Sequence, residues 1–169
     1  GVDMREWVRD GSSGLIRARF QGHSRWVKGL RFGHGEEWSL TSAQDNTIRR
    51  WRVHDRSALP TLAAAGPASK IEFQAAGVGL LTQTDDGMEL ALWEVPGGKR
   101  KRNFVVKSPV LQSSLSHDGK HLWALHEDGT ISQWDTLEET PPRTFQPEMK
   151  VSAMKISNDD RFLLVTSTE

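Results

Sequence analysis

Several residue types and patterns are missing from this chain of 169 residues, and each absence narrows its chemistry. Cysteine is absent, which excludes disulfides, thiolate chemistry and cysteine zinc sites and is compatible with a reducing, cytoplasmic location. Basic and acidic side chains balance at 22 each, so no net charge favours binding to nucleic acid or to an anionic membrane. No apolar run approaches the roughly 20 residues of a membrane-spanning helix.

Tyrosine is also absent, but there are seven tryptophans, and four of them recur at nearly constant spacing. This first ladder, with steps of 44, 42 and 41 residues, consists of Trp7, Trp51, Trp93 and Trp134. A second ladder, with steps of 41, 42 and 41 residues, consists of Phe32, Phe73, Leu115 and Ile156. Two independent ladders with one period indicate an internal repeat of about 42 residues.

Each repeat contains four short runs typical of β-strands, here called strands a, b, c and d. In the clearest repeat these are Val27 to Phe32, Trp38 to Ala43, Thr47 to Val53 and Leu59 to Leu62. The turn between strands b and c is rich in Asp, Asn and Gly, residues that tolerate positive φ and join antiparallel strands. No segment carries a helical apolar stripe over three turns, so the sequence predicts an all-β chain of four-stranded antiparallel sheets.

The tryptophan that ends strand c, together with the repeat length, resembles the WD40 repeat family of β-propellers. Gly22-His23 opens the clearest repeat, Asp45 lies in its b–c turn, and Trp134-Asp135 supplies the family dipeptide in a later repeat. The resemblance implies an open arc of a larger propeller, cut from a longer protein of bacterial type. It implies these blade boundaries: 1–20 for the end of a blade, 21–63, 64–106 and 107–148 for three blades, and 149–169 for the start of another.

By the same resemblance, one repeat carries the set of residues that holds a blade together by hydrogen bonds in this family. The set consists of His23, Thr41, Asp45 and Trp51. The physical logic is that a buried indole needs a partner for its N–H, which a threonine hydroxyl supplies. The next repeat keeps Thr82 and Trp93 but has no Gly-His, and the third has Ala124 in place of the hydroxyl. We therefore expect the later blades to be held mainly by apolar packing.

Three patterns could be mistaken for chemistry. His23, Thr41 and Asp45 contain the residue types of a catalytic triad. A threonine inside a strand, however, does not present its hydroxyl on an exposed turn from which it could attack a substrate. The basic run Lys99 to Arg102 falls in an outer edge strand, where such residues discourage aggregation. The densest group of residue types that can bind a metal lies on a strand and its turns, so its side chains do not share one face as they would on a helix. The group consists of His117, Asp118, His121, His126 and Glu127. We predict no catalytic, metal or cofactor site.

Function is expected where the d–a and b–c loops gather at one end of the propeller, because family members commonly bind peptides and protein segments there. The positions expected to bind a partner are Arg25, Trp26, Gln44, Lys70, Asp85, Lys107, Glu127 and Lys150. Arg25 and Trp26 stand out, since arginine and tryptophan are frequent interface anchors. We predict a scaffold that binds a protein or peptide and also contacts the remaining blades of its parent propeller. The alternatives are a propeller enzyme of the lactonase or hydrolase type and a regulatory repeat region fused to a kinase or ATPase.

Overall fold

The structure is a computed structural model that describes residues 5–33, 38–55, 58–63, 68–73, 79–95 and 98–167. Across these ranges the regular elements are sixteen β-strands, and neighbouring strands in every sheet run antiparallel. The all-β fold class predicted from the repeat is confirmed. The five sheets have two, four, four, four and two strands along the chain.

Three of the sheets have four strands each, joined in the order in which the chain supplies them. The first sheet contains β3 (Val27–Phe32), β4 (Trp38–Ala43), β5 (Thr47–Arg52) and β6 (Ala58–Ala63). The second contains β7 (Ala68–Phe73), β8 (Gly79–Thr84), β9 (Glu89–Glu94) and β10 (Arg100–Val105). The third contains β11 (Val110–Leu115), β12 (His121–His126), β13 (Ile131–Asp135) and β14 (Arg143–Phe145).

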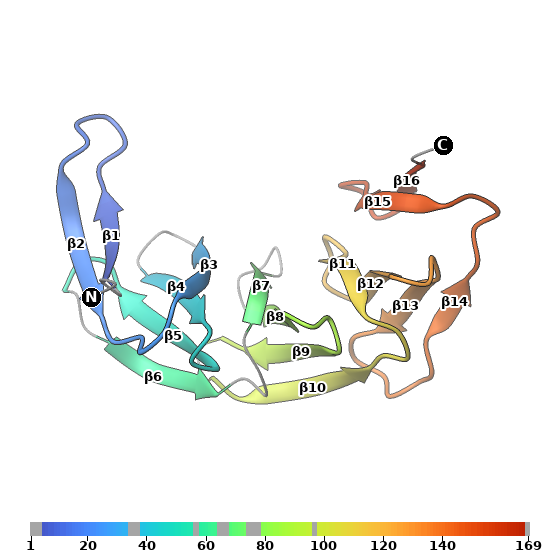
Figure 1. Ribbon diagram of the computed structural model, residues 1–169, viewed down its shortest axis with the longest axis horizontal. Coiled ribbons are helices and arrows are strands. Elements are labelled where there is room, and N and C mark those ends of the chain that lie inside the picture. Colours follow the sequence, from blue (N-terminus) through green and yellow to red (C-terminus); the bar gives the residue numbers. More distant parts are fainter. Residues whose placement is uncertain are drawn as a thin grey trace.

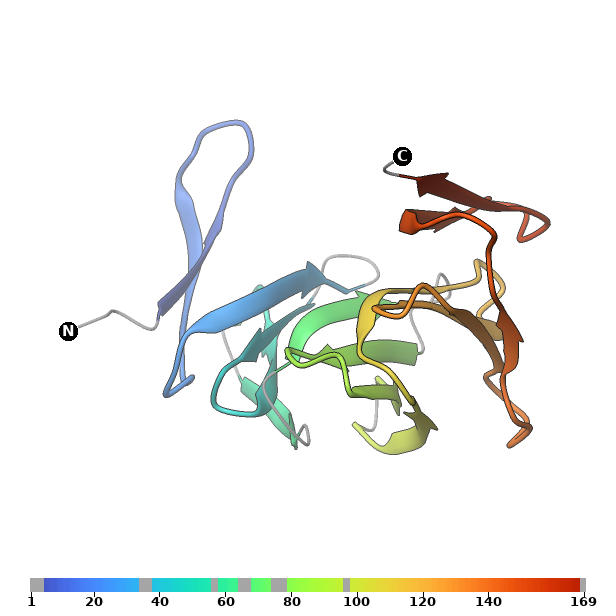
Figure 2. The ribbon, with the colours of Figure 1, turned by 45° about the vertical axis from the view of Figure 1, so that its right-hand side comes forward.

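Two hairpins flank these sheets, one at each end of the described chain. The first pairs β1 (Arg5–Arg9) with β2 (Ile16–Gln21), and the last pairs β15 (Val151–Ile156) with β16 (Leu163–Ser167). The sheets follow one another along an open arc, with β3, β7 and β11 on its inner side and β6, β10 and β14 on its outer side (Figure 1). A turned view also shows the two hairpins far apart, at opposite ends of the arc (Figure 2).

The cores lie between neighbouring sheets, because strand side chains alternate between two faces and each inner sheet has a neighbour on both sides. One core joins Leu40 and Ile48 of the first sheet to Ile71 and Leu80 of the second. A second core joins the second and third sheets in the same way, with Leu81 and Leu90 packed among residues that include Leu115 and Leu122. Sheets packed face to face in this way are the arrangement of open β-propeller blades.

The b–c turns explain why Asp-Asn and Asp-Gly recur at this point of the repeat. The second residue of each pair has positive φ: 63° at Asn46, 68° at Gly87 and 84° at Gly129. In the second sheet a Cβ on Gly87 would lie 2.7 Å from backbone atoms of Val110, so glycine is required there by space as well as by conformation. These turns carry several of the residues that we expected at a binding face.

Candidate functional site

A continuous chain of hydrogen bonds crosses the first sheet and ends at its loops. Trp51 Nε1 donates to Thr41 Oγ1 over 2.9 Å, and Thr41 Oγ1 is also 2.8 Å from His23 Nε2. His23 Nδ1 lies 2.9 Å from Asp45 Oδ2. The four residues come from strand c, strand b, the loop before strand a and the b–c turn. The structure therefore brings together the four residues of the family set.

The contacts determine which nitrogen of His23 carries the proton. Because Thr41 Oγ1 accepts from the indole, its own proton is free to be donated to His23 Nε2, which leaves the Nδ1–H to donate to Asp45. Burial lowers the pKa of His23 below its ordinary value of 6.5, although the hydrogen bond to Asp45 opposes the shift. The His23 ring is therefore neutral at pH 7. Each residue in the series Trp51, Thr41, His23 and Asp45 then donates a hydrogen bond to the next one.

Asp45 fixes the loop that leads into strand a. Its carboxylate accepts from the backbone N–H of Ser24 at 2.9 Å and of Thr47 at 3.0 Å, and from the Thr47 hydroxyl at 2.6 Å. Burial alone would raise the pKa of Asp45, but the hydrogen bonds from Thr47, Ser24 and His23 lower it to about 2. The turn and the loop are thus joined by a permanently charged acceptor at neutral pH.

Glu6 of β1 lies beside this network without completing it. Glu6 Oε1 is 3.8 Å from His23 Nε2, beyond hydrogen-bond reach, and both carboxylate oxygens are buried without a hydrogen-bond partner. Burial raises the pKa of Glu6 to about 7, while the nearby charge of Arg49 lowers it and that of Asp45 raises it. A carboxyl group in this position destabilises the fold when it ionises.

The geometry gives the His23, Thr41 and Asp45 set a structural role rather than a catalytic one. Thr41 is 3% exposed and its hydroxyl already has two partners. A nucleophile must reach a substrate carbonyl, and this oxygen lies inside the sheet. The set therefore stabilises the blade and orients its loops.

The two later sheets have comparable buried hydrogen bonds, but these are made by fewer or different residues. In the second, Trp93 Nε1 donates to Thr82 Oγ1 over 3.0 Å. In the third, His126 bridges the backbone oxygen of Ser108, 2.9 Å from Nδ1, and the Ser132 hydroxyl, 2.8 Å from Nε2. Sequence reasoning missed this second histidine bridge and expected the later blades to be held mainly by apolar packing. The signal available was a serine on strand c, six residues after a histidine that ends strand b.

At the loop end of the first sheet, Arg25 and Trp26 project from the loop that Asp45 fixes. Both are exposed, Trp26 by 58%. The backbone N–H of Gln44 donates to the Trp26 carbonyl over 2.9 Å, so the d–a loop and the b–c turn are joined directly. A hollow of about 470 Å³ lies between them, lined by Ser24, Arg25, Gln44, Asp45 and Asn46. Arg25 and Gln44 thus line one hollow, and the exposed Trp26 is joined to Gln44 through its backbone carbonyl.

The remaining predicted positions divide into two groups. Asp85, Lys107, Glu127 and Lys150 are exposed on loops or turns. Asp85 lies 3.9 Å from Lys28, which links the second b–c turn to the first sheet, and the backbone N–H of Glu127 donates to Pro109 over 2.8 Å. Lys70 differs from our expectation of a loop residue. It lies inside β7, with its Nζ 3.2 Å from Glu72 and bonded to the backbone oxygen of Ser113.

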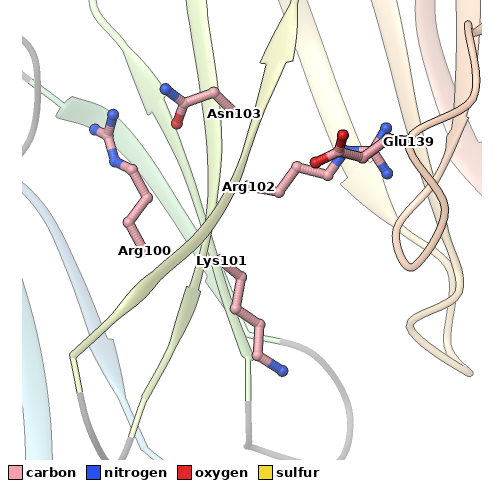
Figure 3. Close-up of a pocket in the computed structure, with 5 residues that line it drawn as sticks. All are labelled: Arg100, Lys101, Arg102, Asn103 and Glu139. Atoms are coloured by element: carbon pink, nitrogen blue, oxygen red, sulfur yellow. The ribbon is translucent and has the colours of Figure 1, made fainter.

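Arg100 to Arg102 of the basic run lie in the outer edge strand β10, and Lys99 directly precedes it. Figure 3 shows the side chains of Arg100, Lys101 and Arg102 pointing in different directions, and with Asn103 and Glu139 they line a hollow of about 460 Å³. Arg100 pairs with Glu89 at 2.7 Å and covers the ring of Trp93, while Arg102 donates to the backbone oxygens of Asp135 and Glu138. Two of the four cations are therefore engaged within the protein, and the group does not converge on one anion.

Two further features concern the described part of the chain. Its His, Asp and Glu side chains form no group of three with the geometry to hold a metal ion. None of its segments is a helix long and apolar enough to span a bilayer.

Comparison with known proteins agrees with the fold. The family model described as "WD domain, G-beta repeat" matches residues 14–52, which include the set from His23 to Trp51. The chain is 25% identical over 167 residues to eukaryotic translation initiation factor 3 subunit I of Eremothecium gossypii, covering 88% of this chain and 48% of that protein. It is 25% identical to the Protein LST8 homolog of Drosophila melanogaster, with coverage of 88% and 50%.

A third relative is the DENN domain and WD repeat-containing protein SCD1 of Arabidopsis thaliana, 33% identical over 115 residues, or 68% of this chain and 9% of that protein. The chain thus spans about half or less of each of these relatives. Together the family model and the relatives support the WD40 repeat family, whose members are typically protein-interaction scaffolds rather than enzymes. All three relatives come from eukaryotes, so the expected bacterial origin gains no support.

Proposed function

We propose that this chain is a protein-interaction module that binds an extended peptide or protein segment on the surface formed by its d–a loops and b–c turns. The observation that carries the proposal is the surface of Arg25, Trp26 and Gln44, because it combines two exposed anchor residues with a rigid support. The proposal keeps the blade boundaries and the cytoplasmic location expected from the sequence.

Rigidity supports this surface as a binding site. Binding costs free energy when flexible side chains and loops become ordered, and a loop that is already ordered avoids part of that cost. Asp45 holds the backbone at Ser24 and Thr47, and Gln44 holds Trp26. The loop that carries Arg25 and Trp26 is thus fixed on both sides by bonds within its own sheet.

The chemistry of the surface indicates what the bound segment offers. Trp26 presents a large aromatic ring that suits an apolar side chain, and Arg25 presents a planar cation that suits a carboxylate. A segment with an apolar residue and an acidic residue close together fits both. Burial of a tryptophan and an arginine near the centre of an interface is a common source of its affinity.

The test uses peptides as the probe. Linear peptides are selected from a phage-displayed library against the whole chain, and the affinity of the best binder is measured by fluorescence polarisation. Trp26→Ala and Arg25→Ala should each weaken binding about tenfold or more, since truncation of an interface anchor costs above 1 kcal/mol. The melting temperature should remain unchanged, because both side chains are exposed.

Leu137→Ala and Lys101→Ala are the matched controls, an exposed apolar and an exposed basic residue away from this surface. Both should leave the affinity unchanged. If the controls weaken binding as much as the two test variants, the loop surface is not the binding site. If Trp26→Ala unfolds the chain, Trp26 belongs to the core and the proposal fails.

A further inference from the structure

A cavity of about 410 Å³ opens between the second and third sheets, beside the linker that joins β10 to β11. The linker, residues 105–108, forms part of its lining, and β13, β14 and the turn between them contribute most of the rest. Trp134, which lines the cavity, also belongs to the core that joins these two sheets. Both sheets have four strands, so the cavity lies within the array of complete sheets.

In the first sheet, side chains occupy the corresponding place. Gly22 lies in the linker before β3, and a Cβ on it would be 2.5 Å from Arg49 Nη1 and 2.9 Å from Trp51 Cη2. These distances leave no room for a side chain, so only glycine lets the linker approach so closely. The guanidinium of Arg49 and the ring of Trp51 therefore pack directly against the linker.

The third sheet has different residues at two of these positions. Ser132 stands two residues before the ladder tryptophan, where the first sheet has Arg49, so a short side chain replaces a long one. Val105 stands five residues before strand a, where the first linker has Gly22, and it is 82% exposed, so its side chain does not close the gap. The cavity therefore follows from the sequence of this repeat and is not a general feature of the fold.

Ser132 has spare hydrogen-bonding capacity at the cavity. The Ser108 carbonyl, 2.9 Å from His126 Nδ1, can only accept a hydrogen bond, so Nδ1 carries the proton in the neutral ring. Nε2 is then an acceptor, and Ser132 Oγ donates to it over 2.8 Å. No donor among the described residues bonds to Ser132 Oγ, so its lone pairs are left for a ligand that supplies an N–H or O–H.

The buried part of the lining favours an uncharged ligand. Its members Trp134, His126 and Ser132 are only 3–5% exposed. The charged lining residues Lys107 and Asp128 are exposed and opposite in sign, so together they select neither an anion nor a cation. An ion that entered the buried part would lose its hydration without gaining a partner of opposite charge.

Rigid apolar groups form the walls, namely the indole ring of Trp134, Val106 and the rings of Pro141 and Pro142. Aromatic rings in edge-to-face or offset contact gain more than the area that they bury. The volume of about 410 Å³ lies near the lower end of the range for small-molecule sites, which suits a molecule of one or two rings.

We propose that this cavity binds a small, uncharged aromatic molecule whose N–H or O–H group donates a hydrogen bond to Ser132 Oγ while its ring packs against Trp134 and the two prolines. The cavity shares no lining residue with the hollow beside Arg25 and Gln44. The proposal is therefore independent of the peptide binding proposed above.

The first test titrates the whole ¹⁵N-labelled chain with indole and follows the indole N–H signals of its seven tryptophans by NMR. The Trp134 signal should shift with a Kd on the order of 1 mM, as expected for a ligand of this size. Trp123 packs on the opposite face of the same sheet, in the core with Val151 and Met154, so its signal should not move. No shift of Trp134, or equal shifts of both signals, would overturn the proposal.

Benzofuran is the matched probe for the hydrogen bond, because it has the shape of indole but no N–H. It should bind about fivefold more weakly, which is the usual net effect of one hydrogen bond. Ser132→Ala should lower the affinity for indole to that for benzofuran and leave benzofuran unchanged. Equal binding of the two probes by the unmodified chain would refute the role of Ser132.

Thr144→Trp tests the place of binding without altering a buried residue. Thr144 is an exposed residue of β14 that lines the cavity, so a tryptophan there should fill it and weaken indole binding about tenfold or more. Thr61→Trp, at an exposed position of the outer strand β6 in the first sheet, is the control and should bind as the unmodified chain does. If both variants bind indole equally well, or lose it equally, the cavity is not the site. This pair decides the matter even if Ser132→Ala fails to fold.

Discussion

Removing the Thr41 hydroxyl is the sharpest perturbation of the hydrogen-bonded set, because this oxygen serves two buried partners. Thr41→Val keeps the shape of the side chain but leaves Trp51 Nε1 and His23 Nε2 without their 2.9 Å and 2.8 Å contacts. A buried polar group that loses its partner costs about 1–3 kcal/mol. Two such groups predict a loss of about 2–6 kcal/mol in the free energy of unfolding.

The second sheet supplies the matched comparison. Thr82 occupies the same position and accepts from Trp93 Nε1 at 3.0 Å, but no histidine contacts it. Thr82→Val should therefore cost about half as much, roughly 1–3 kcal/mol. Urea titrations followed by tryptophan fluorescence give both values. If Thr82→Val costs as much as Thr41→Val, the histidine contributes nothing and the cooperative reading of the set is refuted.

Three further perturbations test the same structure. Trp51→Ala should cost about 3–5 kcal/mol in a urea titration, as deletion of a buried aromatic does, whereas Lys101→Ala on the outer edge should be nearly neutral; equal effects would refute the blade assignment. Asp45→Ala should cost about 1–3 kcal/mol and make the amide of Ser24 exchange faster with solvent, because that N–H loses its acceptor. Glu6, whose pKa is raised from 4.5 to about 7, binds more protons folded than unfolded between these values, so its contribution to stability falls as pH rises through that window. Glu6→Gln should therefore stabilise the chain at pH 8 and not at pH 4, and a difference that is flat with pH would contradict the assignment.

The strands were predictable from the sequence because every blade packs in the same way, so the same positions are apolar in each repeat. The ladders of Trp51 and Phe32 mark positions that face a neighbouring strand or sheet, so periodic burial leaves a periodic sequence. The four residues of the His23 set could be named in advance for a similar reason. Their chemical types and spacing are fixed by a hydrogen-bond chain within a single sheet.

The features that escaped prediction depend on contacts between repeats or on substitutes for the usual set. His126 takes the place of the missing loop histidine from the end of strand b, so the family set, whose histidine precedes strand a, gave no reason to expect it. Lys70 was expected on a loop, but it lies in β7, where its amine contacts Glu72 of the same strand and the backbone oxygen of Ser113 in the next sheet. Glu6 is buried by a neighbouring sheet, so its raised pKa has no local sequence signal.

Hydrogen–deuterium exchange with a selected peptide tests most directly whether the loop surface binds a partner. Exchange is measured along the whole chain with and without the peptide. The account predicts that slowed exchange is confined to the d–a loops and b–c turns, centred on residues 24–26 and 44–46, while residues 99–103 of the outer edge remain unchanged. Slowed exchange on the outer edge strands, with none at Arg25 and Trp26, would contradict it.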